Sequence, residues 1–264
     1  MRIGKQDHPY TSICTSDAQS ITVRGKDLAS EIIGVLDFTS YFWLLVTGTQ
    51  PNAQQQFLAN AVLCAIAEHG LVPSVVATRM TIAAAPEAFQ GAVAAGLLGC
   101  GSVVLGSAEA AGRFYADCIA SAETAGLSDE DAAIEAVKAL RADKRAIPGF
   151  GHPEHSGGDP RAHRLLALAK EQGTEGKHIA MLRTIETVLP ETIGRSLPIN
   201  VNGAIPAVML DAGFPLAALK GISLLARTAS LIGHLQEESE RPIGFIMSGA
   251  AAGRIEYVPN TASD

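Results

Sequence analysis

Alanine- and leucine-rich stretches, separated by glycine and proline, restrict most strongly how this chain of 264 residues can fold. Hydrophobic residues make up 47% of the sequence, but aromatic residues only 5%. Alanine and leucine are strong helix formers, and small side chains let neighbouring helix backbones approach closely. We therefore expect an all-α protein whose length fits one large domain or a large domain with a smaller lobe.

Capping and breaking residues set the expected element boundaries. The first 24 residues contain one candidate strand or hairpin, and helices are predicted over 38–47, 52–68, 87–99, 106–124, 128–143, 162–172, 178–188, 204–212 and 215–238. Pro190 is expected to break its helix, residues 195–202 to be extended, and the tail from Arg241 to be irregular. Gly91, Ala95 and Gly99 form a flat stripe suited to close contact with another helix.

Charge and cysteine usage exclude several classes of partner. The net charge is −7 and no basic block is present, so we expect no nucleic acid and no anionic membrane surface as partners. The start of the chain lacks the apolar core of a signal peptide, and the apolar runs are too short and glycine-rich to span a bilayer. The four cysteines lie far apart without metal-ligand spacing, which favours a cytoplasmic protein without disulfides or a bound metal.

The segment 148–161, PGFGHPEHSGGDPR, interrupts the helical pattern with four glycines and two histidines. His152 follows Gly149 and Gly151, so the backbone beside it can adopt conformations closed to other residues and approach a ligand closely. An ordinary glycine turn with solvated histidines explains the same composition. The pattern alone does not decide between a turn and a site.

Other candidate residues also have two explanations. Arg227 lies in a helix that is apolar nearly all round, so its buried charge needs either an internal acid such as Asp159 or a carboxylate ligand. His69 ends a helix, where the helix dipole favours an imidazole. Asn202 lies in a tight turn and Arg241 on an expected surface, so neither residue is conspicuous alone.

Taken together, these segments resemble the citrate synthase superfamily, which includes citrate synthases, methylcitrate synthases and citryl-CoA lyases. GFGHPEHSGGDPR is similar to the family's "G-Y/F-G-H-…-D-P-R" loop, LPINVNG to its "P-N-V-D" turn, and LLARTASLIGH with ERP to its "A-R-T-x-G" helix and terminal "R-P". ITVRGKDLASEI, FTSYFWLLVTGTQP, EHGLVPSVVATRM and AAGLLGCGSVVLGSAEA match earlier family segments in the same order. The chain looks closest to the short citryl-CoA lyases.

The resemblance implies a role for each matching residue. His152 would exchange a proton with the oxygen of a four-carbon acid, and Asn202 occupies the position of a catalytic aspartate. The acid itself would be bound by His69, Arg161, Arg227 and, from the partner subunit of a dimer, Arg241. The loop Pro148, Gly149, Phe150, Gly151 would lie against the adenine of coenzyme A.

Three positions depart from the family pattern. Leu105 replaces a histidine that polarises the thioester carbonyl, Asn202 replaces the aspartate that moves the methyl proton, and Val72 replaces an asparagine. A carboxamide cannot act as a base, and leucine offers no hydrogen bond. Loss of a general base typically costs ~10²–10⁴-fold in rate, and loss of an oxyanion donor ~10²–10³-fold. Ordinary citrate synthesis should therefore be very slow.

The resemblance thus implies an obligate homodimer with a large helical domain, about 1–112 and 215–264, and a small domain, about 113–214. The expected activity is that of a citryl-CoA lyase-like enzyme, which cleaves or reversibly forms a C–C bond in a citryl-CoA-type thioester to give acetyl-CoA and a 2-oxo acid such as oxaloacetate. Coenzyme A would enter as a thioester substrate, without a metal. The alternatives are a citrate synthase-like acyltransferase and a catalytically silent homologue that binds coenzyme A or a di-acid.

Overall fold

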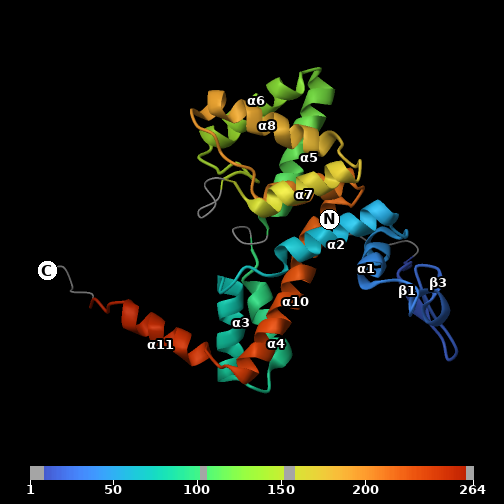
Figure 1. The fold of residues 1–264 in the computed structure, drawn as a ribbon, viewed down its shortest axis with the longest axis vertical. Coiled ribbons are helices and arrows are strands. Elements are labelled where there is room, and N and C mark those ends of the chain that lie inside the picture. The colour runs from blue at the N-terminus through green and yellow to red at the C-terminus, as the bar shows by residue number, and fades with distance from the viewer. Residues whose placement is uncertain (1–8, 102–105, 152–157, 260–264) are drawn as a thin grey trace.

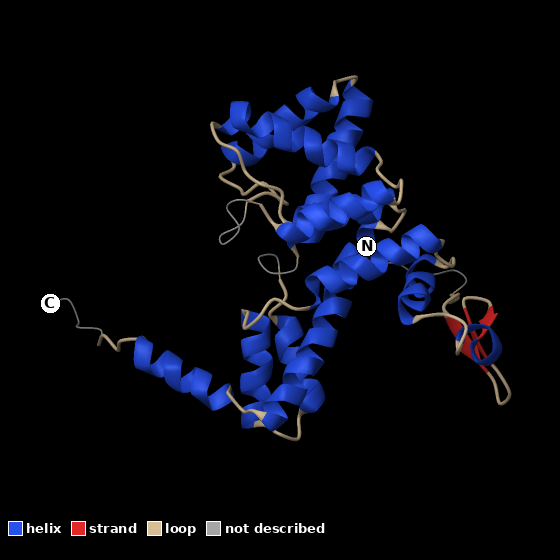
Figure 2. Cartoon of the chain, in the orientation of Figure 1, coloured by secondary structure: helices blue, strands red, loops and turns tan. Residues whose placement is uncertain are grey.

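The computed structural model describes residues 9–101, 106–151 and 158–259, and most of them are helical (Figures 1 and 2). A small antiparallel sheet comes first, formed by β1 (Cys14–Ser16), β2 (Ile21–Val23) and β3 (Lys26–Asp27) in that order. Thr22 of β2 lies opposite Thr15 on one side and Asp27 on the other. The sheet, with the short π-helix η1 (Leu28–Ile32), confirms the predicted hairpin and adds a third strand.

Eleven α-helices and a short 3-10 helix follow within the described residues. They are α1 (Phe38–Thr47), α2 (Ala53–Ala67), α3 (Pro73–Ala84), α4 (Phe89–Leu98), α5 (Ser107–Ala125), α6 (Asp129–Ala142), α7 (Pro160–Glu171), α8 (Lys177–Ile193), α9 (Val201–Asp211), η2 (Leu216–Ala218), α10 (Leu219–Glu240) and α11 (Gly244–Arg254). Every predicted helix is present, and the expectation of a mostly helical protein is confirmed.

The helix ends follow the expected capping chemistry. Asn52 begins α2 with a capping box, because its side chain accepts from the backbone of Gln55 and the Gln55 side chain accepts from the backbone of Asn52. Ser128 caps α6 in the predicted way, by accepting from Asp131 N. Gly48 ends α1 in the left-handed conformation, with φ of 81°, which glycine adopts without steric cost.

Three boundary predictions are wrong, and one helix was missed. The segment 195–202 is not extended to its end, because α9 begins at Val201. Pro190 does not end α8, because the helix continues through it to Ile193 while Leu189 packs in the core. The segment after Arg241 is not irregular but forms α11. Helix α3 was not predicted as an element, although Pro73 stands at its first position, where a proline needs no hydrogen-bond partner.

The helices form two groups around the long helix α10 and helix α9. Helices α5, α6, α7 and α8 lie together in one group, and α9 packs against α5, α7 and α8 (Figure 1). Helices α3 and α4 lie along α10, and α2 packs against α10, α7 and α9. Helix α11 projects away from these groups and packs only its start against α3 (Figure 2).

Small residues allow the closest helix contacts, as the composition suggested. A Cβ atom at Gly96 of α4 would collide with Thr78 and Ser74 of α3 and with Leu231 of α10. Within one chain the packed face of α4 runs through Ala92 and Gly96, so contact of a second subunit with the stripe of Gly91, Ala95 and Gly99 stays a prediction. Gly91 and Gly99 meet mainly their own helix.

One helical segment of the described residues, Leu216–Glu240, has the length and apolar composition of a membrane-crossing helix. A core helix passes the same test. This segment contains η2 and α10, and α10 packs against α2, α3, α4 and α5.

Candidate functional site

The predicted coenzyme A loop is fixed to the start of α9. Asn200 N donates to Gly149 O at 3.0 Å, and the Asn200 side-chain Nδ2 donates to Gly151 O at 2.7 Å. On the same edge, Gly151 N donates to Pro198 O at 2.8 Å, and Phe150 forms a β-bridge with Ile199. These bonds hold the loop in one position relative to Asn202, the second residue of α9.

Two glycines make this contact possible. Gly149 has a φ of 88°, which an L side chain rarely adopts, and Gly203 lies directly against it. A Cβ atom at Gly203 would lie 2.9 Å from the Gly149 Cα atom and closer still to its carbonyl oxygen. The backbone of the loop can therefore touch α9 only because both positions are glycine.

The loop residues face different surroundings. The Phe150 side chain is buried in the hydrophobic core, and Gly149 is covered by Gly203. Pro148 lines a surface cavity of about 320 Å³ together with Phe114, Arg113 and Arg145. Of the four residues predicted to contact coenzyme A, Pro148 therefore borders open space. Side chains of both signs line this cavity, because Glu109 and Asp117 lie beside the two arginines and Glu109 pairs with Arg113.

Asp159 joins the far end of the loop segment to α9. Its carboxylate is fully buried, caps α7, and accepts from Arg161 Nε at 3.0 Å, Arg161 Nη2 at 2.9 Å and Val201 N at 2.9 Å. Burial alone would raise the pKa of Asp159, but these hydrogen bonds outweigh it and hold the pKa at about 2. Asp159 therefore stays ionised and fixes Arg161 beside the start of α9.

This pairing corrects one sequence-based alternative. The sequence allows Asp159 as an internal partner of Arg227, but in the structure Asp159 forms its ion pair with Arg161. Arg227 is only 3% exposed, and it forms no ion pair with any residue of the described ranges. Its Nη1 makes a long hydrogen bond of 3.5 Å to Ser230 Oγ, and its Nε atom has no partner among the described residues.

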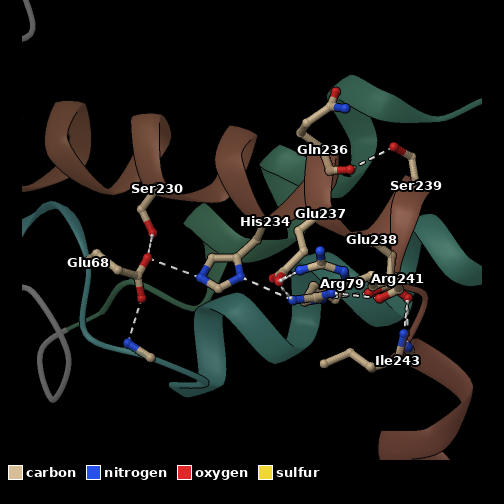
Figure 3. A network of polar contacts seen from close by, with 12 residues as sticks. Glu68, Arg79, Ser230, His234, Gln236, Glu237, Glu238, Ser239, Arg241 and Ile243 are labelled. Carbon is tan, nitrogen blue, oxygen red and sulfur yellow. Dashed lines mark hydrogen bonds and ion pairs between the residues drawn. The ribbon is translucent and has the colours of Figure 1, made fainter.

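Glu68 contacts Ser230 and His234 of α10 (Figure 3), and its backbone neighbour is His69, another predicted binding residue. Glu68 follows α2, and its carboxylate accepts from the backbone N–H groups of His69 and Gly70. The same carboxylate accepts from Ser230 Oγ at 2.5 Å and lies 3.0 Å from His234 Nε2. We call the group formed by Glu68, His69, Arg227, Ser230 and His234 the Arg227 cluster.

Arg241 lies outside this cluster. It follows α10 fourteen residues after Arg227, a distance of about 21 Å at ~1.5 Å per helical residue. Its side chain is 79% exposed and lies 4.0 Å from Glu237. One chain therefore does not bring Arg241 and Arg227 together.

The three departures have different outcomes. Val72 caps α3 without a side-chain hydrogen bond, as expected from the loss of an asparagine. Asn202 is half-buried in the first turn of α9, where the helix dipole would favour a negatively charged side chain. The asparagine found there is neutral, and its amide cannot take up a proton. Leu105 and the predicted catalytic His152 lie outside the described residues.

Sequence reasoning missed Glu68, Ser230 and His234. Their signal was present, because Ser230 and His234 follow Arg227 by three and seven residues, which places all three on one face of a helix. Glu68 directly precedes His69. Only the packing of α2 against α10 shows that these residues belong to one cluster.

Comparisons with known proteins bear on the family and the fold. A family model described as citrate synthase, C-terminal domain, matches residues 11–244. Citryl-CoA lyase from Hydrogenobacter thermophilus is 27% identical with a TM-score of 0.83, covering 100% of this chain and 97% of that one. A search of curated protein sequences gives no match.

Two longer proteins share the fold. An ATP citrate lyase from Methanosaeta concilii, solved with (3S)-citryl-CoA, has a TM-score of 0.73 and 19% identity, covering 98% of this chain and 43% of that one. Citrate synthase from Thermotoga maritima has a TM-score of 0.65 and 19% identity, covering 87% of this chain and 58% of that one.

Proposed function

The chain belongs to the citrate synthase family, and from this membership we propose that it is a citryl-CoA lyase-like enzyme. It would cleave, or reversibly form, a C–C bond in a citryl-CoA-type β-hydroxyacyl-CoA. The products would be acetyl-CoA and a 2-oxo acid such as oxaloacetate. Likeness to a citryl-CoA lyase over the full length of both chains supports this activity over that of a citrate synthase.

The buried guanidinium of Arg227 carries the proposal. An unpaired buried charge costs on the order of 3–5 kcal/mol. No carboxylate of the described residues pairs directly with Arg227, and Glu68 reaches it only through the hydroxyl of Ser230. Ser230 occupies Nη1, which leaves the Nε edge for a carboxylate that approaches in the plane of the guanidinium. A substrate with carboxylate groups fits this requirement.

In the proposed cleavage, His152 takes the hydroxyl proton of the substrate. The C–C bond breaks, the carbonyl of the 2-oxo acid forms, and the electron pair of the broken bond passes to the thioester as an enolate. Water then protonates the enolate carbon to give acetyl-CoA. Asn202 can hydrogen-bond a reacting group but cannot move a proton, so cleavage places fewer demands on this site than abstraction of a methyl proton.

The cavity beside Pro148 suits the nucleotide end of the thioester. Arg145 offers positive charge for a phosphate group, and Phe114 offers an aromatic face for a base, while Arg113 would have to exchange its ion pair with Glu109 for a phosphate. Because Asn200 and Gly203 hold the loop rigidly, a nucleotide bound there would lie at a fixed distance from Asn202.

A homodimer with shared sites, in the cytoplasm, completes the proposal. Helix α11 exposes large apolar side chains, with Phe245 71% and Ile246 67% accessible in the single chain. A second subunit would cover such a surface and could receive Arg241 in its own site. The distance between Arg241 and Arg227 within one chain supports this arrangement.

The direct test is incubation of the pure protein with citryl-CoA while acetyl-CoA and oxaloacetate are measured, with the reverse condensation assayed in parallel. Arg227→Gln should lower kcat/KM by ~100-fold or more, because a charge-assisted bidentate contact is lost. Arg164→Gln is the matched control, since Arg164 forms an exposed ion pair with Glu171. Condensation without cleavage would favour the acyltransferase alternative, and binding without turnover would favour a silent homologue.

A further inference from the structure

The Arg227 cluster contains a carboxylate that the proposed reaction does not use. Glu68 accepts hydrogen bonds from Ser230 and from the backbone of His69 and Gly70, and it faces the ring of His234 (Figure 3). Burial alone would raise its pKa, but these contacts lower the pKa below its usual value. A carboxylate so fully bonded is a poor base, which points to a structural connection rather than proton transfer.

The direction of each hydrogen bond can be assigned. Arg79 is always a donor, so His234 Nδ1, 3.4 Å from Arg79 Nη1, must be the acceptor. The ring proton of neutral His234 then lies on Nε2 and is donated to Glu68 Oε2 at 3.0 Å. Ser230 Oγ donates its proton to the same oxygen, so its lone pair is left to face Arg227 Nη1.

The far side of His234 is held just as firmly. Arg79 is buried and forms ion pairs with Glu237 at 2.8 Å and with Glu238 at 2.5 Å. Its Nη2 donates to the carbonyl of Arg241 at 3.2 Å, which ties it to the end of α10. His234 therefore sits between a fixed cation and a fixed carboxylate.

We propose that Glu68, supported by His234, is a positioning residue that fixes His69 and Arg227 for the carboxylates of the substrate. It holds the turn that carries His69 and orients Ser230 toward Nη1 of Arg227, so that among the described residues the Nε atom stays without a partner. The identity of the ligand rests on the proposed function, but the geometry of the cluster does not.

The first test compares Glu68→Gln with Glu240→Gln, which removes the same charge from the exposed end of α10. Glu68→Gln should raise KM for citryl-CoA by ~10-fold or more, because small displacements of binding groups cost up to ~100-fold. The dissociation constant for coenzyme A alone should stay unchanged in both variants, and Glu68→Asp should restore part of the loss. A wild-type KM in Glu68→Gln would overturn the positioning role.

A second readout needs no activity. In protein labelled with ¹⁵N-histidine, at a pH where the rings are neutral, His234 should show the Nε2–H tautomer. His69→Gln and His234→Gln identify the two signals among the seven histidines. Glu68→Gln should shift both signals, whereas Glu240→Gln should shift neither.

These two readouts separate the proposals. If the wild type neither binds nor cleaves citryl-CoA, the proposed function fails, and the histidine spectra still decide the role of Glu68. Unmoved signals of both histidines in Glu68→Gln would overturn the role whatever the activity. Ser230→Ala provides a second variant if Glu68→Gln does not fold, and it should raise KM for citryl-CoA while leaving the His234 tautomer unchanged.

Discussion

At the scale of single residues, two buried charges are satisfied in different ways. Asp159 has its partner Arg161 and the backbone of Val201 within the same chain. Arg227 has only the hydroxyl of Ser230 among the described residues. The first charge is therefore paired within the protein, while the proposed function assigns the pairing of the second to an anionic substrate.

The stability of the protein should reflect the Asp159 carboxylate. Because its folded pKa of about 2 lies below the ordinary value of 3.8, its contribution is complete above about pH 4 and is lost as the pH falls through 2. Asp159→Asn should lower the free energy of unfolding at pH 7 by about 3 kcal/mol. The difference in the free energy of unfolding between wild type and Asp159→Asn should become smaller as the pH falls from about 4 to 2.

Urea unfolding at pH 7, pH 3 and pH 2 measures both effects. Glu171→Gln is the control, because the exposed ion pair of Glu171 with Arg164 should contribute less than about 1 kcal/mol. A constant difference between wild type and Asp159→Asn from pH 7 to pH 2 would contradict the assignment of the low pKa to Asp159.

At the scale of elements, the contact between the 148–151 loop and α9 depends on the absence of one side chain. Gly203→Ala should destabilise the protein by about 1–3 kcal/mol, because the added Cβ would meet backbone atoms of Gly149 that cannot move aside. The affinity for coenzyme A should fall as well if the loop binds its nucleotide.

A second helical glycine provides the comparison. A Cβ atom at Gly221 of α10 has open space around it, so Gly221→Ala should stabilise the protein by about 0.5–1 kcal/mol through helix propensity alone. Thermal or urea unfolding of both variants distinguishes the two effects. If both substitutions changed the free energy of unfolding equally, the contact with the loop would not be what makes Gly203→Ala destabilising.

Local signals predicted most elements, and tertiary contacts explain the failures. Asn52 and Ser128 marked helix starts because capping is a property of neighbouring residues. The prediction that Pro190 ends its helix was wrong because the burial of Leu189 and its neighbours outweighs the loss of one backbone hydrogen bond at the proline. Helix α11 exposes most of its side chains in one chain, so its sequence lacks the pattern of a helix that packs on its own core.

The candidate site, too, was predicted in its residues but not in their contacts. The resemblance pointed to His69 and Arg227, but no local pattern joined them through Glu68, because α2 and α10 lie far apart in the sequence. The pairing of Asp159 with Arg161 was likewise open, since charge and spacing allowed several partners for a buried arginine. Which acid pairs with which base depends on packing that the sequence does not display.

At the scale of the whole molecule, the position of Arg241 predicts shared sites. Subunits carrying Arg241→Ala are mixed with subunits carrying His152→Ala, each inactive alone. In a mixed dimer one site carries both changes and the other carries neither, so random pairing should restore roughly a quarter of wild-type activity. If subunit exchange is verified and activity stays at the parental level, Arg241 does not serve a partner's site.

The long-range polar contacts of α10 also set an order of events during synthesis. Glu68 and Ser230 are 162 residues apart, and Arg79 and Glu238 are 159 residues apart. A ribosome therefore releases α2 and α3 long before it makes α10, whose Glu237 and Glu238 pair with Arg79 of α3. Until α10 arrives, Arg79 has to remain hydrated, so helices α2 and α3 can dock fully only when the chain is nearly finished.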